Sequence, residues 1–133
     1  MIKTKELMLG NWVLAGAKTQ FPMYVTGIFD GVAYLDFEGN EGDVWEEKEE
    51  DMLPVPLTEK ILLKNRFVKK KDKISEYYNS PDGNVFVRFK KEISVLVILP
   101  LSTARVGARN RIKYVHELQN LLTLAGIEME FKI

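Results

Sequence analysis

The 133-residue sequence contains no cysteine and a single histidine, His116. Without cysteine the chain has no disulfide framework, no thiolate nucleophile and no cysteine-based zinc site. A zinc-protease helix needs a second histidine one turn after the first, and in HELQN that position holds Asn120. We therefore expect no metal, and we interpret His116 as an exposed or edge histidine on the polar face of a helix.

Long apolar runs and the glycine-rich loops of nucleotide-binding enzymes are also absent. The longest apolar stretch, Ile93–Leu101, contains Ser94 and Pro100 and is too short to span a bilayer. The N-terminal MIKTKELML lacks the apolar core of a signal peptide. Neither GxGxxG nor GxxxxGK(S/T) occurs, and no serine lies in a nucleophile elbow. We therefore expect a soluble, cytoplasmic protein that needs no cofactor and is not an enzyme.

The formal net charge is zero, but the two halves of the chain differ in sign. Residues up to Pro56 include 4 Lys and Arg against 11 Asp and Glu, a net charge of −7, whereas those from Leu57 onward include 15 against 8, a net charge of +7. The run EEKEED at Glu46–Asp51 is typical of exposed charge, not of the buried carboxylates that acid–base catalysis needs. The two halves either form solvated surfaces that happen to differ in charge, or form surfaces of opposite charge that face each other within one molecule or between copies.

Residues 1–53 are predicted to form a small β-barrel-like unit of the Src-homology-3 (SH3) kind. Three segments rich in β-branched and aromatic residues are expected to be strands, at 11–15, 23–29 and 32–37. Asp30-Gly31 between the last two is typical of a type I′ hairpin turn, which needs positive φ at both positions. Short strands joined by tight turns favour a small barrel.

Pro54-Val55-Pro56 is predicted to be a stiff connector that opens an α+β unit, residues 54–133. Thr58 is expected to cap a short helix, and Asn65 to end it. A mostly antiparallel sheet of three strands follows: one at 67–70 that either continues or does not continue into 74–79, one at 84–90 and one at 93–99. Residues 128–133 can return as a last strand. ISVLVIL at 93–99 predicts a central strand covered on both faces. The predicted fold class is therefore α+β, with this sheet covered by one short and one long helix.

The long helix is predicted over Asn110–Gly126. Asn110 is expected to cap its first turn, and Gly126 is expected to end it in the left-handed conformation. Val115, Leu118 and Leu122 recur at three- and four-residue steps. These side chains are therefore expected to bury one face of the helix against the sheet.

Three stretches of the sequence resemble motifs of one family. They are LGNWV at Leu9–Val13, PVPLTEKILLKNRF at Pro54–Phe67 and YVHELQNLL at Tyr114–Leu122. In this order they are similar to a family of small uncharacterised proteins common in phages and mobile elements of Bacteroidales-type gut bacteria. The family motif usually has Gly where this chain has Arg66, which leaves Asn65 to end the first helix. The resemblance implies an accessory protein of a mobile element and carries no activity, cofactor or catalytic residue.

Aromatic side chains are concentrated in the N-terminal unit. Most are expected to be core, because a barrel of this size has little else to bury. A few left on the surface would form a peptide-binding groove, the common use of such barrels, and the candidates are Trp12, Tyr24 and Trp45.

Basic side chains surround the predicted start of the long helix: Arg105, Arg109, Arg111 and Lys113. Cations are disfavoured near the positive end of a helix dipole, so a negative group is expected to compensate them. We therefore predict an anion-contacting or partner-binding patch. A second basic stretch, Lys64–Lys73, is interpreted as a solvated strand edge, because lysine protects sheet edges from aggregation.

These patterns together predict a non-catalytic, protein-binding accessory protein. Its partner is expected to be another protein or a second copy of the chain, and not a membrane. The alternative is a nucleic-acid-binding accessory factor that uses the basic C-terminal half.

Overall fold

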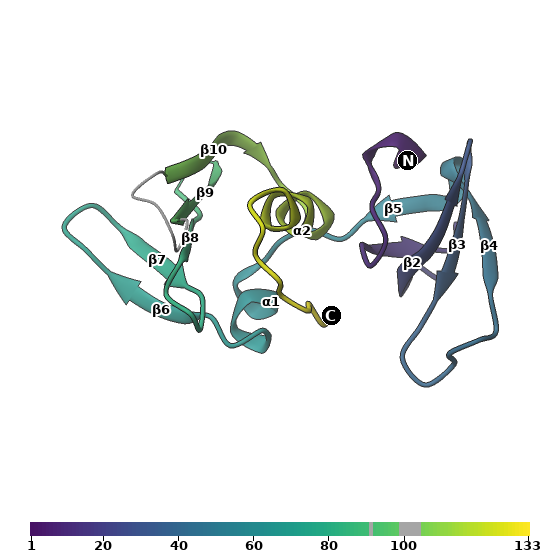
Figure 1. Ribbon diagram of the computed structural model, residues 1–133, viewed down its shortest axis with the longest axis horizontal. Helices are drawn as coiled ribbons and strands as arrows, with labels where there is room; N and C mark the ends of the chain where they lie inside the picture. The colour runs from purple at the N-terminus through teal and green to yellow at the C-terminus, as the bar shows by residue number, and fades with distance from the viewer. Residues whose placement is uncertain (91, 99–104) are drawn as a thin grey trace. The chain divides into compact units, whose positions relative to one another are not determined.

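The computed structural model describes residues 1–90, 92–98 and 105–133, apart from the side chains of residue 98 and residues 105–111 (Figure 1). Within these residues the chain is α+β, with two five-stranded antiparallel sheets and two α-helices. It divides into two compact units. The first comprises Met1–Pro56 and Tyr114–His116, and the second comprises Leu57–Lys113 and Glu117–Ile133.

The first unit is a single antiparallel sheet with short 3-10 helices beside it. Its elements are η1 (Thr4–Glu6), β1 (Trp12–Ala15), β2 (Phe21–Phe29), β3 (Val32–Asp36), β4 (Trp45–Lys48), η2 (Glu49–Asp51) and β5 (Met52–Pro54). The strand order is β4-β3-β2-β1-β5. No pairing between β4 and β5 closes this sheet among the described residues, so it is an open sheet whose edges are those two strands.

The core of the first unit lies on one face of its sheet. Alternate residues of the strands are buried there, together with two from the N-terminal segment: Ile2, Leu7, Val13, Ala15, Met23, Val25, Ala33, Leu35 and Met52. This alternation is what a period-2 strand requires when one face is packed. A bulge between Val25 and Gly27 breaks the register with β3. At Gly27 an added Cβ would lie 3.1 Å from the ring of Tyr34, so a larger residue is disfavoured.

The turn between β2 and β3 differs from the predicted type I′ turn. Gly31 has a φ of +78°, but Asp30 is not among the described residues with positive φ. Only one of the two central positions is therefore left-handed. The hydroxyl of Thr4 also holds this turn by accepting from the Gly31 N–H at 3.2 Å. The carboxylate of Glu49 in turn accepts from the Thr4 N–H and hydroxyl at 2.7 and 2.9 Å. These hydrogen bonds lower the pKa of Glu49.

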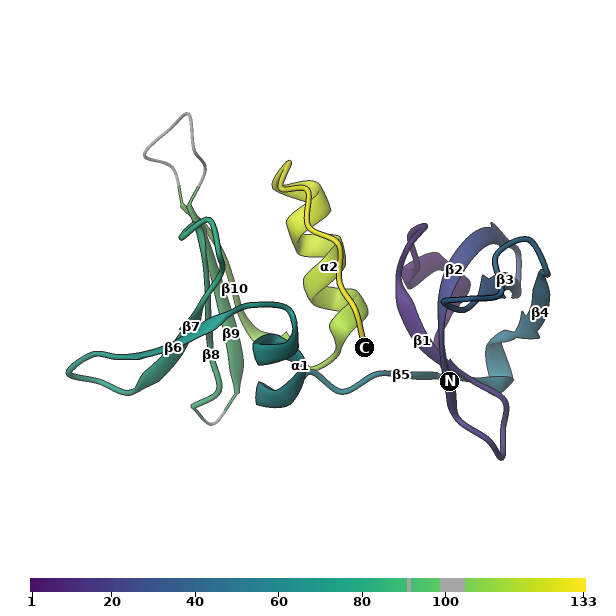
Figure 2. The ribbon, with the colours of Figure 1, turned by 90° about the horizontal axis from the view of Figure 1, so that it is seen from below.

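The second unit is a meander with helices on one side. Its elements are α1 (Glu59–Lys64), β6 (Val68–Lys71), β7 (Glu76–Asn79), β8 (Val85–Arg88), β9 (Ile93–Ile98), β10 (Arg105–Ile112) and α2 (Val115–Leu124). The strand order is β10-β9-β8-β7-β6. Both helices lie on the same side of this sheet (Figure 2).

Strand β9 is central, as predicted, but only one of its faces is fully packed. Val95 and Val97 are buried, as are Val85 and Val87 on β8. Leu96 lies between the two buried valines of β9 and is only half-buried. The prediction of cover on both faces was therefore wrong, because both helices lie on the side of the buried valines. The other face of the sheet remains accessible in the described part of the unit.

Helix α1 begins as predicted and ends differently. The hydroxyl of Thr58 accepts from the Ile61 N–H at 3.3 Å, which is an N-cap. Asn65 has a φ of −93°, and it is Arg66 that takes the left-handed conformation, with a φ of +67°. The backbone therefore reverses one residue later than predicted, which leaves the Asn65 side chain for another role.

Helix α2 begins five residues later than predicted. Residues Arg105–Ile112 form β10 and pair with β9, so Asn110 lies in a strand and caps no helix. These residues precede the periodic apolar positions of the helix, and their backbone groups pair with β9 instead. A carboxylate oxygen of Glu117 accepts from the Lys113 N–H at 3.0 Å and satisfies a free donor at the start of α2. The end is as predicted, with Gly126 left-handed at a φ of +76°.

His116 is buried, with 4 % of its surface exposed, so its predicted place on an exposed polar face was wrong. Its ring stacks on the ring of Tyr114, with centroids 6.0 Å apart and planes 10° apart. An imidazole has enough apolar surface to be buried in such a stack.

The C-terminal segment is extended but is not the predicted strand. The Asn65 side-chain amide exchanges two hydrogen bonds with the backbone of Lys132, each 2.8 Å long. Phe131 is buried, and its ring lies 6.3 Å from that of Phe67. A side chain therefore replaces the backbone partner that a strand would need.

We expect Leu118→Ala to lower the free energy of unfolding by about 2–5 kcal/mol, because Leu118 is fully buried and the change leaves a cavity. Leu124→Ala on the same helix is the control, and its effect should stay within about 0.5 kcal/mol, because Leu124 is 80 % exposed. Urea unfolding followed by far-ultraviolet circular dichroism measures both. Equal effects would contradict this placement of α2.

Asp72 and Arg88 tie the β6–β7 hairpin to β8. The guanidinium and carboxylate form a two-pronged pair, with nitrogen–oxygen distances of 2.6 and 3.2 Å. The carboxylate of Asp72 also accepts from the N–H groups of Ile74 and Ser75. Hydrogen bonding from Arg88, followed by that from the turn backbone, lowers the pKa of Asp72 far below its usual range.

This pair predicts an acid-dependent loss of stability. The pKa of Asp72 is lower in the folded than in the unfolded protein. Its contribution to the free energy of unfolding is therefore complete above its pKa in the unfolded chain, about 4, and is lost as the pH falls toward its pKa in the folded protein. Asp72→Asn should therefore lower the thermal midpoint at pH 7, and the difference from the parent should shrink below pH about 4. Scanning calorimetry measures the thermal midpoint of each protein at each pH. Glu50→Gln, which removes an exposed carboxylate, is the control. A difference that is the same at pH 7 and pH 3 would refute the coupling.

Candidate functional site

Two aromatic rings meet on the face of the first sheet that lies opposite its core. Trp12 on β1 pairs directly with Tyr24 on β2. Their rings are 5.5 Å apart and edge-to-face, with planes at 77°. Trp12 is 9 % exposed and Tyr24 is half-buried. The tryptophan thus supports the tyrosine, whose ring remains partly accessible.

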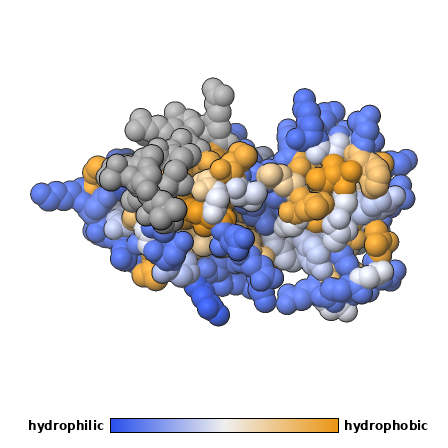
Figure 3. All heavy atoms as spheres, viewed as in Figure 1, coloured by the Kyte–Doolittle hydropathy of each residue, from blue (hydrophilic) through white to orange (hydrophobic). Residues whose placement is uncertain are grey.

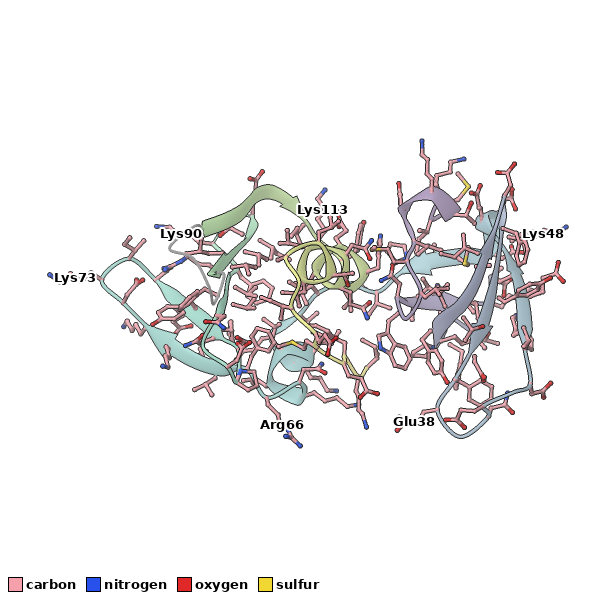
Figure 4. All side chains as sticks on the ribbon, in the orientation of Figure 1. Glu38, Lys48, Arg66, Lys73, Lys90 and Lys113 are labelled. Atoms are coloured by element: carbon pink, nitrogen blue, oxygen red, sulfur yellow. The ribbon has the colours of Figure 1, made fainter. Side chains whose placement is uncertain are left out.

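A buried carboxylate places acidic side chains beside this pair. Asp36 is opposite Tyr24 on β3 and is 4 % exposed. Its two oxygens accept from the N–H groups of Phe37 and Gly42, at 2.8 and 3.0 Å. These bonds fold the loop between β3 and β4 back on itself. The loop carries Glu38 and Glu41, both exposed, and Glu38 points away from the unit (Figure 4).

Tyr24 lies in an environment of negative charge. Desolvation raises the pKa of its phenol most, and the carboxylates of Asp36, Glu41 and Glu38 raise it further. Like any tyrosine, Tyr24 is protonated at neutral pH and can donate a hydrogen bond. We call Trp12, Tyr24, Asp36, Glu38 and Glu41 the Tyr24 surface. An aromatic face beside carboxylates attracts cations.

The third predicted groove residue, Trp45, lies elsewhere. It is opposite Leu35, one residue before Asp36, so by strand alternation it lies on the other face from Tyr24. Its indole N–H donates to Glu47 at 2.9 Å, and its ring is 54 % exposed. The structure thus brings together two of the three predicted groove residues.

Apolar side chains also reach the surface of the first unit, where they appear as orange patches among polar residues (Figure 3). The exposed large ones are Met1, Leu9, Phe21, Phe29, Val44 and Trp45. Phe21 contacts Phe37 and Phe29 contacts Tyr34 in edge-to-face pairs. Most of these rings therefore belong to local aromatic pairs and not to one groove.

The predicted anion patch is not at a helix start. Arg105, Arg109 and Arg111 lie on β10, and their side chains are outside the described residues. Lys113 is exposed between β10 and α2 (Figure 4). The helix-dipole argument for these arginines was therefore wrong, because a strand has no comparable dipole. Anion contact by these residues stays a prediction.

Sequence reasoning missed Asp36, Glu38 and Glu41. A signal was available, because these acidic residues flank the Gly39–Gly42 reversal directly after a strand that carries alternating apolar residues. Their proximity to Tyr24 depends on the pairing of β2 with β3 and on the two bonds that Asp36 accepts.

Among the residues that the structure describes, no three His, Asp or Glu side chains gather as metal ligands do. Neither described helix has the length and apolar character needed to cross a membrane. Comparisons of the chain with family models, curated proteins and solved structures found no match.

Neutralising the loop carboxylates should lower the pKa of Tyr24 toward its ordinary value. In the variant Glu38→Gln/Glu41→Gln, fewer negative charges oppose formation of the phenolate. Titration of proteins labelled with ¹³C at the tyrosine ring, followed by NMR, measures each phenol separately. Glu6→Gln/Glu50→Gln is the control with the same change in charge. If both double variants shift the pKa equally, the loop does not hold its carboxylates beside Tyr24.

Proposed function

We propose that this chain is a cytoplasmic, non-catalytic accessory protein of phage or mobile-element origin, and that it binds a basic segment of a partner protein through the Tyr24 surface. The mobile-element context is what the three family-like motifs imply. The binding role is supported by one observation above all: a half-buried tyrosine, backed by a tryptophan, lies opposite Asp36, which folds an acidic loop whose carboxylates raise the pKa of the tyrosine.

The charge of the first unit favours a cationic partner. The chain up to Pro56 has a net charge of −7, and the loop after β3 carries Glu38 and Glu41. A lysine or arginine side chain can lie against the Tyr24 ring while its charged group approaches these carboxylates. Because Asp36 fixes the loop through backbone hydrogen bonds, little ordering is needed when the partner binds.

We also propose that the first unit is an SH3-like small barrel. Four facts support this: β1 to β4 form a meander, η2 joins β4 to β5, β5 pairs with β1, and β2 is bulged. Bulges bend strands and re-aim side chains, as closure of a small barrel requires. Such barrels commonly hold extended peptides against aromatic side chains.

A fluorescently labelled peptide of alternating lysine and glycine or serine tests the proposed function. It should bind the parent more tightly than a matched glutamate peptide, and less tightly as salt rises. Glu38→Gln/Glu41→Gln should weaken binding by about 2- to 30-fold, because each exposed charge pair contributes about 0.2–1 kcal/mol. Tyr24→Phe should retain most of the affinity, because the ring is kept. Fluorescence anisotropy measures the affinity of the parent for both peptides, its dependence on salt, and the affinity of each variant for the lysine peptide.

The matched control is again Glu6→Gln/Glu50→Gln, which removes two exposed charges of the first unit outside the Tyr24 surface. If it weakens binding as much as the loop variant, the peptide responds to net charge alone. A parent protein that does not prefer the lysine peptide at low salt would refute the proposal directly.

A further inference from the structure

The free edge of the second sheet carries positive charge that its neighbours do not neutralise. All four residues of β6 are exposed. Lys69 is 3.4 Å from Glu59 and 3.2 Å from Glu76. By contrast, the ion pairs of the described residues include none made by the three lysines further along this hairpin: Lys70, Lys71 and Lys73.

The one carboxylate at the tip of this hairpin is already engaged. Asp72 pairs with Arg88 and accepts from the backbone of its own turn. Its charge therefore offsets that of Arg88, and the lysines on either side remain available. Lys73 lies at the tip, at the end of the second unit furthest from α2 (Figure 4). Ile74 beside it is 71 % exposed.

Aromatic rings lie among these charges on the accessible face of the sheet. Lys70 pairs with Tyr77 across β6 and β7, and the Arg88 guanidinium lies 5.4 Å from the centre of the Tyr77 ring. The Phe86 ring is 5.8 Å from that of Tyr77. Val85 and Val87 on either side of Phe86 are fully buried, so by alternation these rings lie on the face opposite the helices. Both rings are half-buried.

We propose that the accessible face formed by Lys70, Tyr77, Phe86 and Arg88, together with Lys73 at the tip of the hairpin, binds single-stranded nucleic acid. Lys70 and Lys73 contact phosphates. Bases stack on the Phe86 ring and on the Arg88 guanidinium, which Asp72 and Tyr77 hold in place. Proteins that bind single strands combine basic tracks with aromatic stacking in this way, and guanidinium planes also stack with unpaired bases.

Charge complementarity favours this occupant. The chain from Leu57 onward has a net charge of +7, and a nucleic acid supplies a regular row of negative charges. The aromatic rings favour a single strand over a duplex, because only unpaired bases expose their faces. This inference concerns the second unit and does not depend on the Tyr24 surface.

Fluorescence anisotropy with labelled oligothymidine and oligouridine of about 16 nucleotides tests the proposal, since one single-strand-binding domain covers at most about that length. The same strands as duplexes are the comparison. Lys70→Ser/Lys73→Ser should weaken binding and make the plot of log affinity against log salt shallower by about 1.4 units of slope, because each phosphate contact to a single strand contributes about 0.7. Phe86→Leu should weaken binding about fivefold or more, whereas Tyr77→Phe should leave it unchanged.

Lys5→Ser/Lys18→Ser is the control, because it removes two exposed lysines of the first unit. It should retain the salt slope of the parent, and Glu38→Gln/Glu41→Gln should not weaken nucleic-acid binding. Circular dichroism checks that every variant is folded. The proposal is overturned if the parent binds no single strand at low salt, if duplex binds equally well, or if the two lysine variants behave alike. It is also overturned if the hairpin variant loses only self-association, which would make a second copy of the chain the partner.

Discussion

Within the described residues each sheet buries its main apolar core on one face, and both proposed binding surfaces depend on that constraint. In the first sheet the buried set includes Val13, Val25 and Leu35, and in the second it includes Val85 and Val97. Strand alternation then directs every second side chain away from the core. Tyr24, Tyr77 and Phe86 on those other faces are only partly buried, so their rings are accessible to a ligand without any change in the fold.

A single aspartate organises the loop beside each surface. Asp36 accepts from two backbone N–H groups and folds the acidic loop after β3. Asp72 accepts from two backbone N–H groups and from Arg88, and it holds the turn of the basic hairpin. In both cases the carboxylate of the aspartate is hydrogen-bonded to groups of the same molecule. The exposed charges nearby therefore set the local potential, which is negative on the first unit and positive on the hairpin.

Local signals predicted much of the secondary structure, and long-range pairing accounts for most of the errors. The Thr58 cap and the left-handed Gly126 were predicted correctly, because each depends on a few neighbouring residues. Asn110 was predicted to cap the long helix because its side chain can accept from a first helical turn, but β10, which contains it, pairs with β9. The C-terminal segment was assigned to a strand, but its partner is the side chain of Asn65.

The sequence by itself determined the α+β class, the opposite charges of the two halves and the burial of Val115, Leu118 and Leu122. These features follow from composition and periodicity, which can be read without knowing which strands pair or which elements pack together. Only the tertiary structure decided that Tyr24 lies opposite Asp36 and apart from Trp45, and that Arg88 reaches Asp72. Such proximities depend on strand register, and a shift of one residue moves every side chain to the other face.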